Sequence, residues 1–265
     1  MLSEVLTFIF FVLIGLEIRE GLNRPKDAIL PAISALGGMI FPALIFLTLN
    51  PHSRAWAVSM PTDVALAIGA LSIMGKRVNP AVRLFLLTLA VADDFFSLVV
   101  IGIFFSNDLH LASGIYTLGA AGLGFILPKR ETLIRYLSPV ATFVIIPIYI
   151  FINLLTKLDF TVATEKISIS IVVARVIGKV LGISLFAYLA TRFSKVTLPP
   201  SLELKEIVGV GFLAGMGLTV SIVIAEITLN ADSELAQVRM GLFFAAIFSG
   251  ALGLLWLRRF PASLK

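Results

Sequence analysis

The sequence predicts an all-α polytopic membrane protein with about nine transmembrane helices. Of its 265 residues, 58% are hydrophobic and only 14% are charged, and the mean hydropathy is +1.03. A soluble domain has about 25% charged residues. One globule cannot bury so much apolar surface, so the excess is expected to face lipid. The apolar residues also gather in runs close to the roughly 20 residues that a helix needs to cross a bilayer.

The predicted helices are nine apolar segments that together form one transmembrane domain covering residues 1–265. Backbone polar groups in lipid must be satisfied within the segment, which favours helices. The alternating pattern of barrel strands is absent. The segments cover about residues 2–18, 28–49, 56–75, 82–106, 111–127, 138–156, 168–192, 206–229 and 238–257.

The distribution of basic residues predicts how the chain is oriented. Most of the 21 Lys and Arg residues lie in loops that the nine spans place on one side. The loops of the other side have only Arg54, Lys157, Lys166 and Arg239. Basic loops remain in the cytoplasm. We therefore expect a multi-pass protein of the bacterial inner membrane, with its N-terminus outside and its C-terminus in the cytoplasm.

Composition also excludes several classes of function. The chain has no cysteine and two histidines, which excludes a disulfide framework, a thiol nucleophile and a Cys- or His-rich metal centre. The net charge of +5 follows the loop topology, so the expected partner is the lipid bilayer and not a nucleic acid. No nucleophile with a histidine base lies at membrane depth, so we do not expect an enzyme.

Four charged residues lie near the middle of predicted spans, namely Asp63, Asp93, Asp94 and Lys179. Each costs roughly 2.5–3.5 kcal/mol at mid-bilayer on insertion scales. Leucine would fill a purely structural position without this cost. The four side chains are therefore expected to face the interior of the bundle or an aqueous cavity. Arg175, one turn before Lys179, is expected to extend toward the outer membrane interface.

Asp93 and Asp94 are neighbours on one predicted helix, so their side chains point about 100° apart. One carboxylate can line a cavity while the other meets an adjacent helix, where Lys179 is the natural partner. Carboxylate oxygens are suitable ligands for a hard cation, and the same oxygen cannot hold a proton and a sodium ion together. This competition is the minimum that ion–proton exchange requires. A buried structural salt bridge with Lys179 is the alternative.

Asp63 and Thr62 follow Pro61 in the middle of a predicted span. Proline removes a backbone donor and clashes with the preceding turn, which predicts a broken helix. The ends of the two half-helices would then carry partial charges near the midplane. Asp63 could neutralise the positive end and Thr62 could add an oxygen. The alternative is a simple kink that Asp63 caps.

The segment 206–229 is the second interrupted span, because it contains a dense run of glycines that includes Gly215 and Gly217. Paired interrupted spans in corresponding halves are typical of transporters built from inverted repeats. Residues 28–106 and 168–257 each form a three-helix group with the interrupted span in the centre. The two groups begin on opposite sides of the membrane, which predicts two inverted repeats whose broken helices cross at the midplane.

The chain resembles the NhaA-type sodium/proton antiporters over most of its length. The motifs that carry the resemblance are Pro61-Thr62-Asp63, Ala92-Asp93-Asp94, Gly178-Lys179-Val180-Leu181-Gly182 and Gly215-Met216-Gly217-Leu218-Thr219. The resemblance implies an antiporter that exports Na⁺ or Li⁺ in exchange for protons, serves sodium and pH homeostasis, and needs no cofactor.

The resemblance also implies residue roles. Asp94 would be the principal carboxylate that exchanges sodium and protons, with Asp93 as the second carboxylate of the sodium site. Asp93 would pair with Lys179 and exchange that salt bridge for access to the ion. Asp63 and Thr62 would lie at the crossing of the two broken helices.

Several features depart from the family pattern. The family usually has about twelve spans, and this chain is expected to lack the first span, its dimerisation hairpin and about two spans between Asn107 and Leu137. A homodimer is therefore an open expectation. For Glu17, at the cytoplasmic end of the first span, pH sensing and a plain interface charge both stay open. Ser138 stands where charged or histidine residues are common in the family.

Two other functions stay open at this point. One is a sodium-coupled symporter of organic anions with a related fold, which would need a larger cavity and more polar groups. The other is an inactive, shortened remnant of the family.

Overall fold

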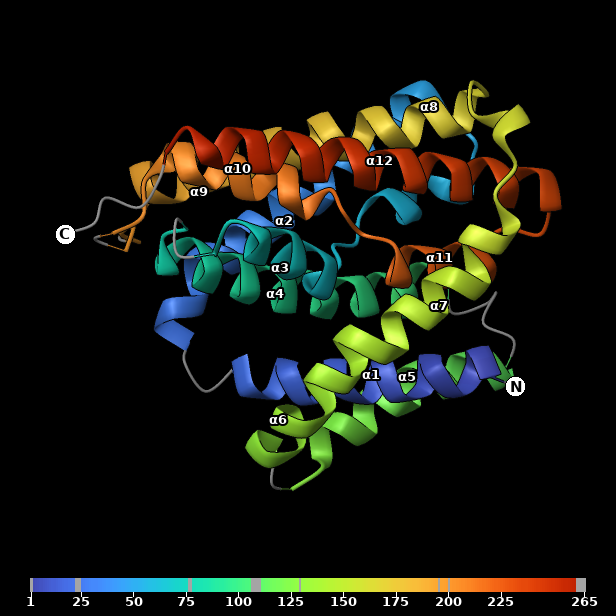
Figure 1. Ribbon diagram of the computed structural model, residues 1–265, viewed down its shortest axis with the longest axis horizontal. Coiled ribbons are helices and arrows are strands. Elements are labelled where there is room, and N and C mark those ends of the chain that lie inside the picture. Colours follow the sequence, from blue (N-terminus) through green and yellow to red (C-terminus); the bar gives the residue numbers. More distant parts are fainter. Residues whose placement is uncertain are drawn as a thin grey trace.

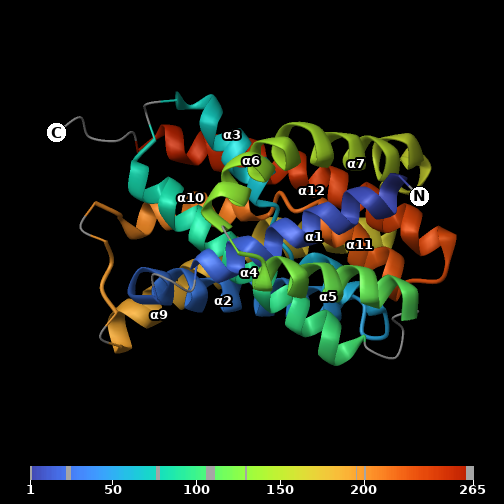
Figure 2. The ribbon, with the colours of Figure 1, turned by 90° about the horizontal axis from the view of Figure 1, so that it is seen from below.

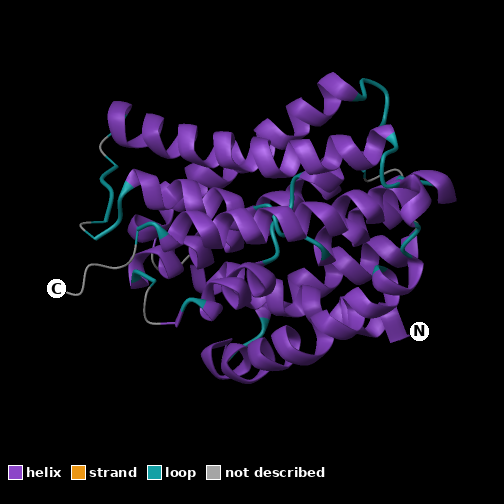
Figure 3. Cartoon of the chain, turned by 45° about the horizontal axis from the view of Figure 1, so that its top comes forward, coloured by secondary structure: helices purple, strands orange, loops and turns teal. Residues whose placement is uncertain are grey.

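The structure is a computed structural model that describes residues 2–21, 25–75, 78–105, 111–128, 130–194, 196–199 and 201–260. Within these ranges all regular secondary structure is helical (Figure 3). The predicted all-α class is therefore confirmed for the described part of the chain. Residue 106, the last residue of the predicted span 82–106, lies outside the described residues.

The described residues form twelve α-helices. They are α1 (Leu2–Gly21), α2 (Pro25–Leu49), α3 (Val64–Ile73), α4 (Pro80–Phe104), α5 (Leu111–Ile126), α6 (Arg130–Val140), α7 (Ile146–Asn153), α8 (Lys166–Val173), α9 (Lys179–Phe193), α10 (Leu204–Ala214), α11 (Thr219–Thr228) and α12 (Asp232–Arg258). Single π-helical turns join α6 to α7 (Ala141–Ile145) and α8 to α9 (Ala174–Gly178). A short 3₁₀ helix, η1 (Arg54–Ser59), precedes α3.

Six helical segments of the described chain are long and apolar enough to cross a membrane, and the bent pair α10–α11 makes a seventh. The polytopic class is thus supported, while the ninefold count stays a prediction. The two expected spans that are not among them are α1 and α5. α5 has only 16 residues, and α1 has charged residues near both of its ends.

The helices form a layered bundle (Figure 1). α8, α9, α10 and α12 lie on one side, α2, α3 and α4 in the middle, and α1, α5 and α6 on the opposite side. α7 continues obliquely from α6 toward the turn before α8. Figure 2 shows α1 beside α5 and α2 beside α9, the two pairs with the most extensive contacts.

Glycines allow these two pairs to approach closely. A Cβ atom on Gly182 of α9 would lie 2.0 Å from the carbonyl oxygen of Gly37 on α2, and a Cβ on Gly124 of α5 would lie 2.0 Å from the carbonyl oxygen of Val12 on α1. Without a side chain the two backbones can pack directly against each other, as small residues allow in membrane helices. The contact between Gly182 and Gly37 brings the start of α9, where Lys179 lies, next to α2 and the middle layer.

The apolar core is divided into two clusters, with polar residues between them. One cluster joins α1, η1, α7, α8 and α11, and the other joins α3, α9, α10 and the first half of α4. On α4, Asp93 and Asp94 lie between members of the two clusters, and on the α8–α9 segment Arg175 and Lys179 do so. The fold therefore collects these four buried charges in one layer.

Candidate ion site

Two helix interruptions meet in this polar layer. Residues 60–63 separate η1 from α3, and residues 215–218 separate α10 from α11, which are bent by 50° relative to each other. Figure 1 shows the two connecting segments passing each other near the centre of the bundle. Both predicted interruptions are present in the structure. The break before α3 consists of residues 61–63, which belong to no helix, and Asp63 in an extended conformation caps the helix that follows.

Asp63 lies between the N-terminal ends of α3 and α11. It is the N-cap of α3, and its Oδ1 accepts a hydrogen bond from the Leu66 N–H at 3.4 Å. Its Oδ2 accepts from the backbone N–H and the hydroxyl of Thr219, at 3.3 and 2.8 Å. A helix N-terminus carries a partial positive charge and unpaired N–H groups. One carboxylate therefore complements two helix ends at once.

Asp93 forms an ion pair with Lys179 across the interface between α4 and α9. The Lys179 Nζ lies 3.3 Å from Asp93 Oδ2, and both side chains are shielded from solvent. Thr62 completes the arrangement: its N–H donates to Asp93 Oδ2 at 2.5 Å, and its hydroxyl accepts from Lys179 at 2.9 Å. Buried charges need this pairing, because an isolated charge in a low-dielectric interior is costly.

Asp94 points away from this pair and into a cavity. The cavity has a volume of about 140 Å³, and oxygen-bearing residues line part of it. The Oδ1 of Asp94 is buried and has no hydrogen-bond partner among the described residues. The cavity has room for several water molecules, and unpaired buried polar atoms are the groups that such water binds. The polar lining residues are Glu17, Thr62, Asp63, Asp94, Ser138 and Thr142.

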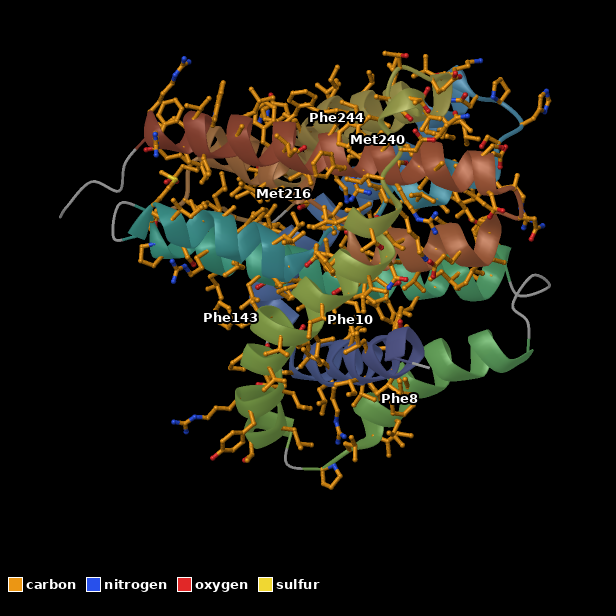
Figure 4. The ribbon with its side chains drawn as sticks, turned by 45° about the vertical axis from the view of Figure 1, so that its right-hand side comes forward. Phe8, Phe10, Phe143, Met216, Met240 and Phe244 are labelled. Carbon is orange, nitrogen blue, oxygen red and sulfur yellow. The ribbon has the colours of Figure 1, made fainter. Side chains whose placement is uncertain are left out.

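Apolar side chains close the cavity on the side of α7. Phe10 and Ile146 line both this cavity and a smaller one of about 10 Å³, which Tyr149 and Thr219 also line. In Figure 4, Phe10 lies between α1 and the α6–α7 segment, whereas Phe8 lies on the α5 side of α1. The polar cavity and the smaller space are thus separated by two large side chains.

Glu17 belongs to the same cavity as Asp94. Its Oε1 accepts a hydrogen bond from the hydroxyl of Ser138 at 3.1 Å, and the side chain is half-buried. The residue that departs from the family pattern, Ser138, is therefore the hydrogen-bond partner of Glu17.

Arg175 corrects one expectation. It does not extend to an interface, because its side chain is fully buried among the broken segments. It donates to the carbonyl oxygens of Val58 at 2.8 Å and Gly215 at 3.1 Å, to that of Pro61, and to the Ser221 hydroxyl at 2.8 Å. Sequence alone could not distinguish a snorkelling arginine from one whose partners lie 40 to 117 residues away. The sequence signal for a buried Arg175 was its position one helical turn before Lys179, on the same face of the helix.

Gly215 and Gly217 lie in the second interruption as expected. Gly215 is the C-cap of α10, and its carbonyl is one of the Arg175 acceptors. A Cβ on Gly217 would lie 2.0 Å from an Arg175 guanidinium nitrogen and 2.1 Å from the Pro61 carbonyl oxygen. Met216, between them, packs against Gly250 of α12 (Figure 4).

No three acidic, histidine or cysteine residues of the described chain are arranged to hold a metal ion together. A cation at Asp94 would therefore need oxygen atoms from hydroxyl groups and water in addition to its carboxylate. Na⁺ is a hard cation, and such oxygens suit hard cations. Asp93 could contribute an oxygen only where it gives up part of its contact with Lys179.

Comparison with known proteins identifies the family. The sequence profile of the "Na+/H+ antiporter 1" family matches residues 1–132 and 126–257, which together are most of the chain. The chain belongs to this family.

Individual members of the Na+/H+ antiporter 1 family are similar over most of their length. The Na(+)/H(+) antiporter NhaA 2 of Aliarcobacter butzleri is 30% identical over 318 residues, covering 95% of this chain and 80% of that protein. The Na(+)/H(+) antiporters NhaA of Salmonella typhimurium LT2 and Escherichia coli O1:K1 are 32% identical over 319 residues, covering 97% of this chain and 82% of each. All three alignments are longer than the 265 residues of the chain itself, so these relatives contain aligned stretches without a counterpart here.

The place where the two profile matches meet, residues 126–132, falls inside the region where spans were expected to be missing. The family assignment and the site agree in another respect. The motifs that suggested the family contain Thr62, Asp63, Asp93 and Lys179. In the fold, Thr62, Asp93 and Lys179 share one hydrogen-bond network. Asp63, the residue after Thr62, bonds to Thr219.

Proposed function

We propose that this protein is a sodium/proton antiporter of the inner membrane, which exports Na⁺ or Li⁺ in exchange for protons. The observation that carries the proposal is the position of Asp94: an unpaired carboxylate oxygen in a polar cavity, one residue from a buried Asp93–Lys179 pair. A carboxylate that has no fixed partner can take either a proton or a cation. The names of the relatives support the same activity.

In this proposal Asp94 exchanges Na⁺ and H⁺ directly. When Na⁺ occupies the cavity, the carboxylate is deprotonated, and when a proton returns, the negative charge that held the cation is lost. Asp93 joins the cation as its second carboxylate when it separates from Lys179. Asp63 and Thr62 keep the crossing in register during this exchange. No resident cofactor takes part, because both transported species are ions.

The size of the cavity favours small ions over organic anions. Pockets for organic ligands usually measure about 300–1,000 Å³, more than twice the 140 Å³ found beside Asp94. A symporter for organic anions would also need fixed cations facing the cavity, and the polar residues that line it are acidic or neutral.

We further propose that each continuous or interrupted segment crosses the membrane once, with the N-terminus outside and the C-terminus in the cytoplasm. The nine crossings would be α1, α2, η1–α3, α4, α5, α6–α7, α8–α9, α10–α11 and α12. α2 to α4 and α8 to α12 would then form two inverted repeats with the interrupted segment in the centre of each. Labelling of single cysteines introduced at Ser53 and Ser201 from each side of the membrane tests this, because the two should react from opposite sides. A homodimer is the oligomer to test by cross-linking in the membrane.

The site is tested by Asp94→Asn in inverted membrane vesicles. Asparagine keeps the volume but cannot release a proton or bind a cation by charge, so Na⁺-induced proton release should be lost. Asp232→Asn, an exposed residue in the first turn of α12, is the matched control and should exchange normally. The folded variants are compared by Na⁺-dependent thermal stabilisation, because only a real site shifts unfolding by mass action. Unchanged exchange by Asp94→Asn rejects the site, and the absence of both exchange and stabilisation in the unmodified protein favours the inactive remnant.

A further inference from the structure

Arg175 holds the two interrupted segments together at the ends opposite to Asp63. Two of its acceptors, the carbonyls of Val58 and Pro61, belong to the last turn of η1 and the break after it, and the third is the carbonyl of Gly215 at the end of α10. Carbonyl groups at a helix C-terminus lack intrahelical partners and carry a partial negative charge. One guanidinium therefore complements two C-terminal ends, as one carboxylate complements two N-terminal ends.

A guanidinium suits this position better than an ammonium. It stays charged under all physiological conditions and presents five N–H donors in a rigid plane. Four of its hydrogen bonds are accounted for by three carbonyls and the Ser221 hydroxyl. These acceptors come from both interrupted segments, so the planar group fixes one segment relative to the other.

Gly217 provides an independent observation for the same contact. A Cβ atom on Gly217 would lie directly beside the hydrogen bond between the Arg175 guanidinium and the Pro61 carbonyl, 2.0 and 2.1 Å from those two groups. A methyl group there would displace the guanidinium or the carbonyl. The chain thus has a glycine at a position where a side chain would block the connection.

The connection continues from Pro61 to the ion pair. Thr62, the next residue, donates its N–H to Asp93 and accepts from Lys179. Lys179 donates hydrogen bonds to Thr62 and Asp93. None of these bonds goes to a helix-end carbonyl. The two buried cations therefore have different tasks, since Arg175 binds helix-end carbonyls and Lys179 binds Asp93 and Thr62.

We propose that Arg175 is a positioning residue for ion exchange: by holding the carbonyl ends of both interrupted segments, it fixes Thr62 against Asp93 and Lys179. This inference rests on the proposed antiport at the adjacent carboxylates. It assigns the fixed positive charge of the crossing to Arg175, so that Lys179 can separate from Asp93 while the crossing stays assembled.

The experiment compares Arg175→Lys, Arg175→Gln and Gly217→Ala with the unmodified protein in proteoliposomes. Arg192→Gln is the matched control, because Arg192 is an exposed arginine in the last turn of the same α9 helix. The measurements are the maximal rate of Na⁺-driven proton movement, the half-saturating Na⁺ concentration and the melting temperature in detergent. The half-saturating concentration is the decisive quantity, because a purely structural role would change the amount of folded protein and leave it constant.

We expect Arg175→Lys and Gly217→Ala to raise the half-saturating Na⁺ concentration at least about tenfold, as the loss of one hydrogen bond to a charged group implies. Arg192→Gln should behave as the unmodified protein. If Arg175→Gln does not fold, the lysine and Gly217 variants decide the question. Folded variants with an unchanged half-saturating concentration overturn the inference, and so does failure of all three to fold, which would assign Arg175 to folding alone. Absence of exchange in the unmodified protein would instead reject the proposed antiport.

Discussion

Asp63 and Thr219, which are 156 residues apart in the sequence, are joined by two hydrogen bonds at the centre of the bundle. Both the N–H and the hydroxyl of Thr219 donate to the same carboxylate oxygen, Oδ2. This is the direct link between the N-terminal ends of α3 and α11. The crossing of the interrupted helices therefore depends on a local contact that can be removed by a small substitution.

Thr219→Val should weaken the crossing. It removes the hydroxyl donor at nearly constant volume, and loss of a buried hydrogen bond to a charged group costs about 1.5–3 kcal/mol. Thr228→Val is the matched control, since Thr228 is buried on the same helix and its hydroxyl donates to the Ile224 carbonyl within that helix. Thermal unfolding in detergent should show the larger loss for Thr219→Val. Equal losses for the two variants would contradict a special role for this contact.

The buried ion pair predicts a non-additive double variant. Removing one partner of a buried pair leaves an uncompensated charge and destabilises by about 3–5 kcal/mol. Asp93→Asn and Lys179→Gln should each have this effect, whereas the double variant should lose less than their sum because neither charge remains. A double-mutant cycle on unfolding free energies in detergent measures the difference. Strict additivity would show that the 3.3 Å contact contributes nothing to stability.

Competition between Na⁺ and H⁺ at Asp94 predicts a defined pH dependence. As the pH falls, protons occupy the carboxylate for a larger share of the time, so more Na⁺ is needed. With one competing proton, the half-saturating Na⁺ concentration should rise by up to about tenfold per pH unit. Exchange at saturating Na⁺ should change much less. Stopped-flow measurements of proton release in proteoliposomes between about pH 6 and 9 test this. A half-saturating Na⁺ concentration that is independent of pH would refute the competition.

Glu17 and Ser138 predict an effect on pH dependence without loss of transport. The hydrogen bond between them is 3.1 Å long and borders the cavity of Asp94. Glu17→Gln removes a charge that acts on that cavity, and Ser138→Ala removes the bond that orients it. Both should shift the pH of half-maximal exchange and leave Asp94-dependent exchange in place. If neither variant moves the pH profile, Glu17 is an interface charge without a sensing role.

The contact of α2 and α9 predicts that Gly182→Ala is destabilising. Its Cβ would lie 2.0 Å from the Gly37 carbonyl oxygen, and overpacking costs about 1–3 kcal/mol. Gly102→Ala is the control, because Gly102 lies within the α4 helix and has nothing within 4 Å of the added carbon. Gly102→Ala should leave the melting temperature unchanged or raise it. The pair would fail as a prediction if both variants melted alike.

Sequence reasoning singled out the candidate residues in mid-span, such as Asp63, Asp94 and Lys179, because each one violates a local rule. A charge within an apolar span, or a proline and a glycine cluster within a helix, is visible without any knowledge of neighbours. For the same reason Arg175 was misplaced: an arginine near a predicted span end satisfies the local rule for snorkelling. Nothing in its own segment shows that the acceptors are the carbonyls of Val58, Pro61 and Gly215.

The amino-acid sequence established the membrane class, the order of the apolar helices and the residues that are too costly to be incidental, because hydropathy and helix-breaking residues act over one or two turns. The tertiary structure decided which carboxylate pairs with Lys179, that Asp94 faces the cavity together with Glu17, and that Arg175 joins the helix ends. These facts depend on contacts between segments dozens to more than a hundred residues apart. Such contacts exist only after α2, α4, α9 and the two interrupted segments have packed around one polar layer.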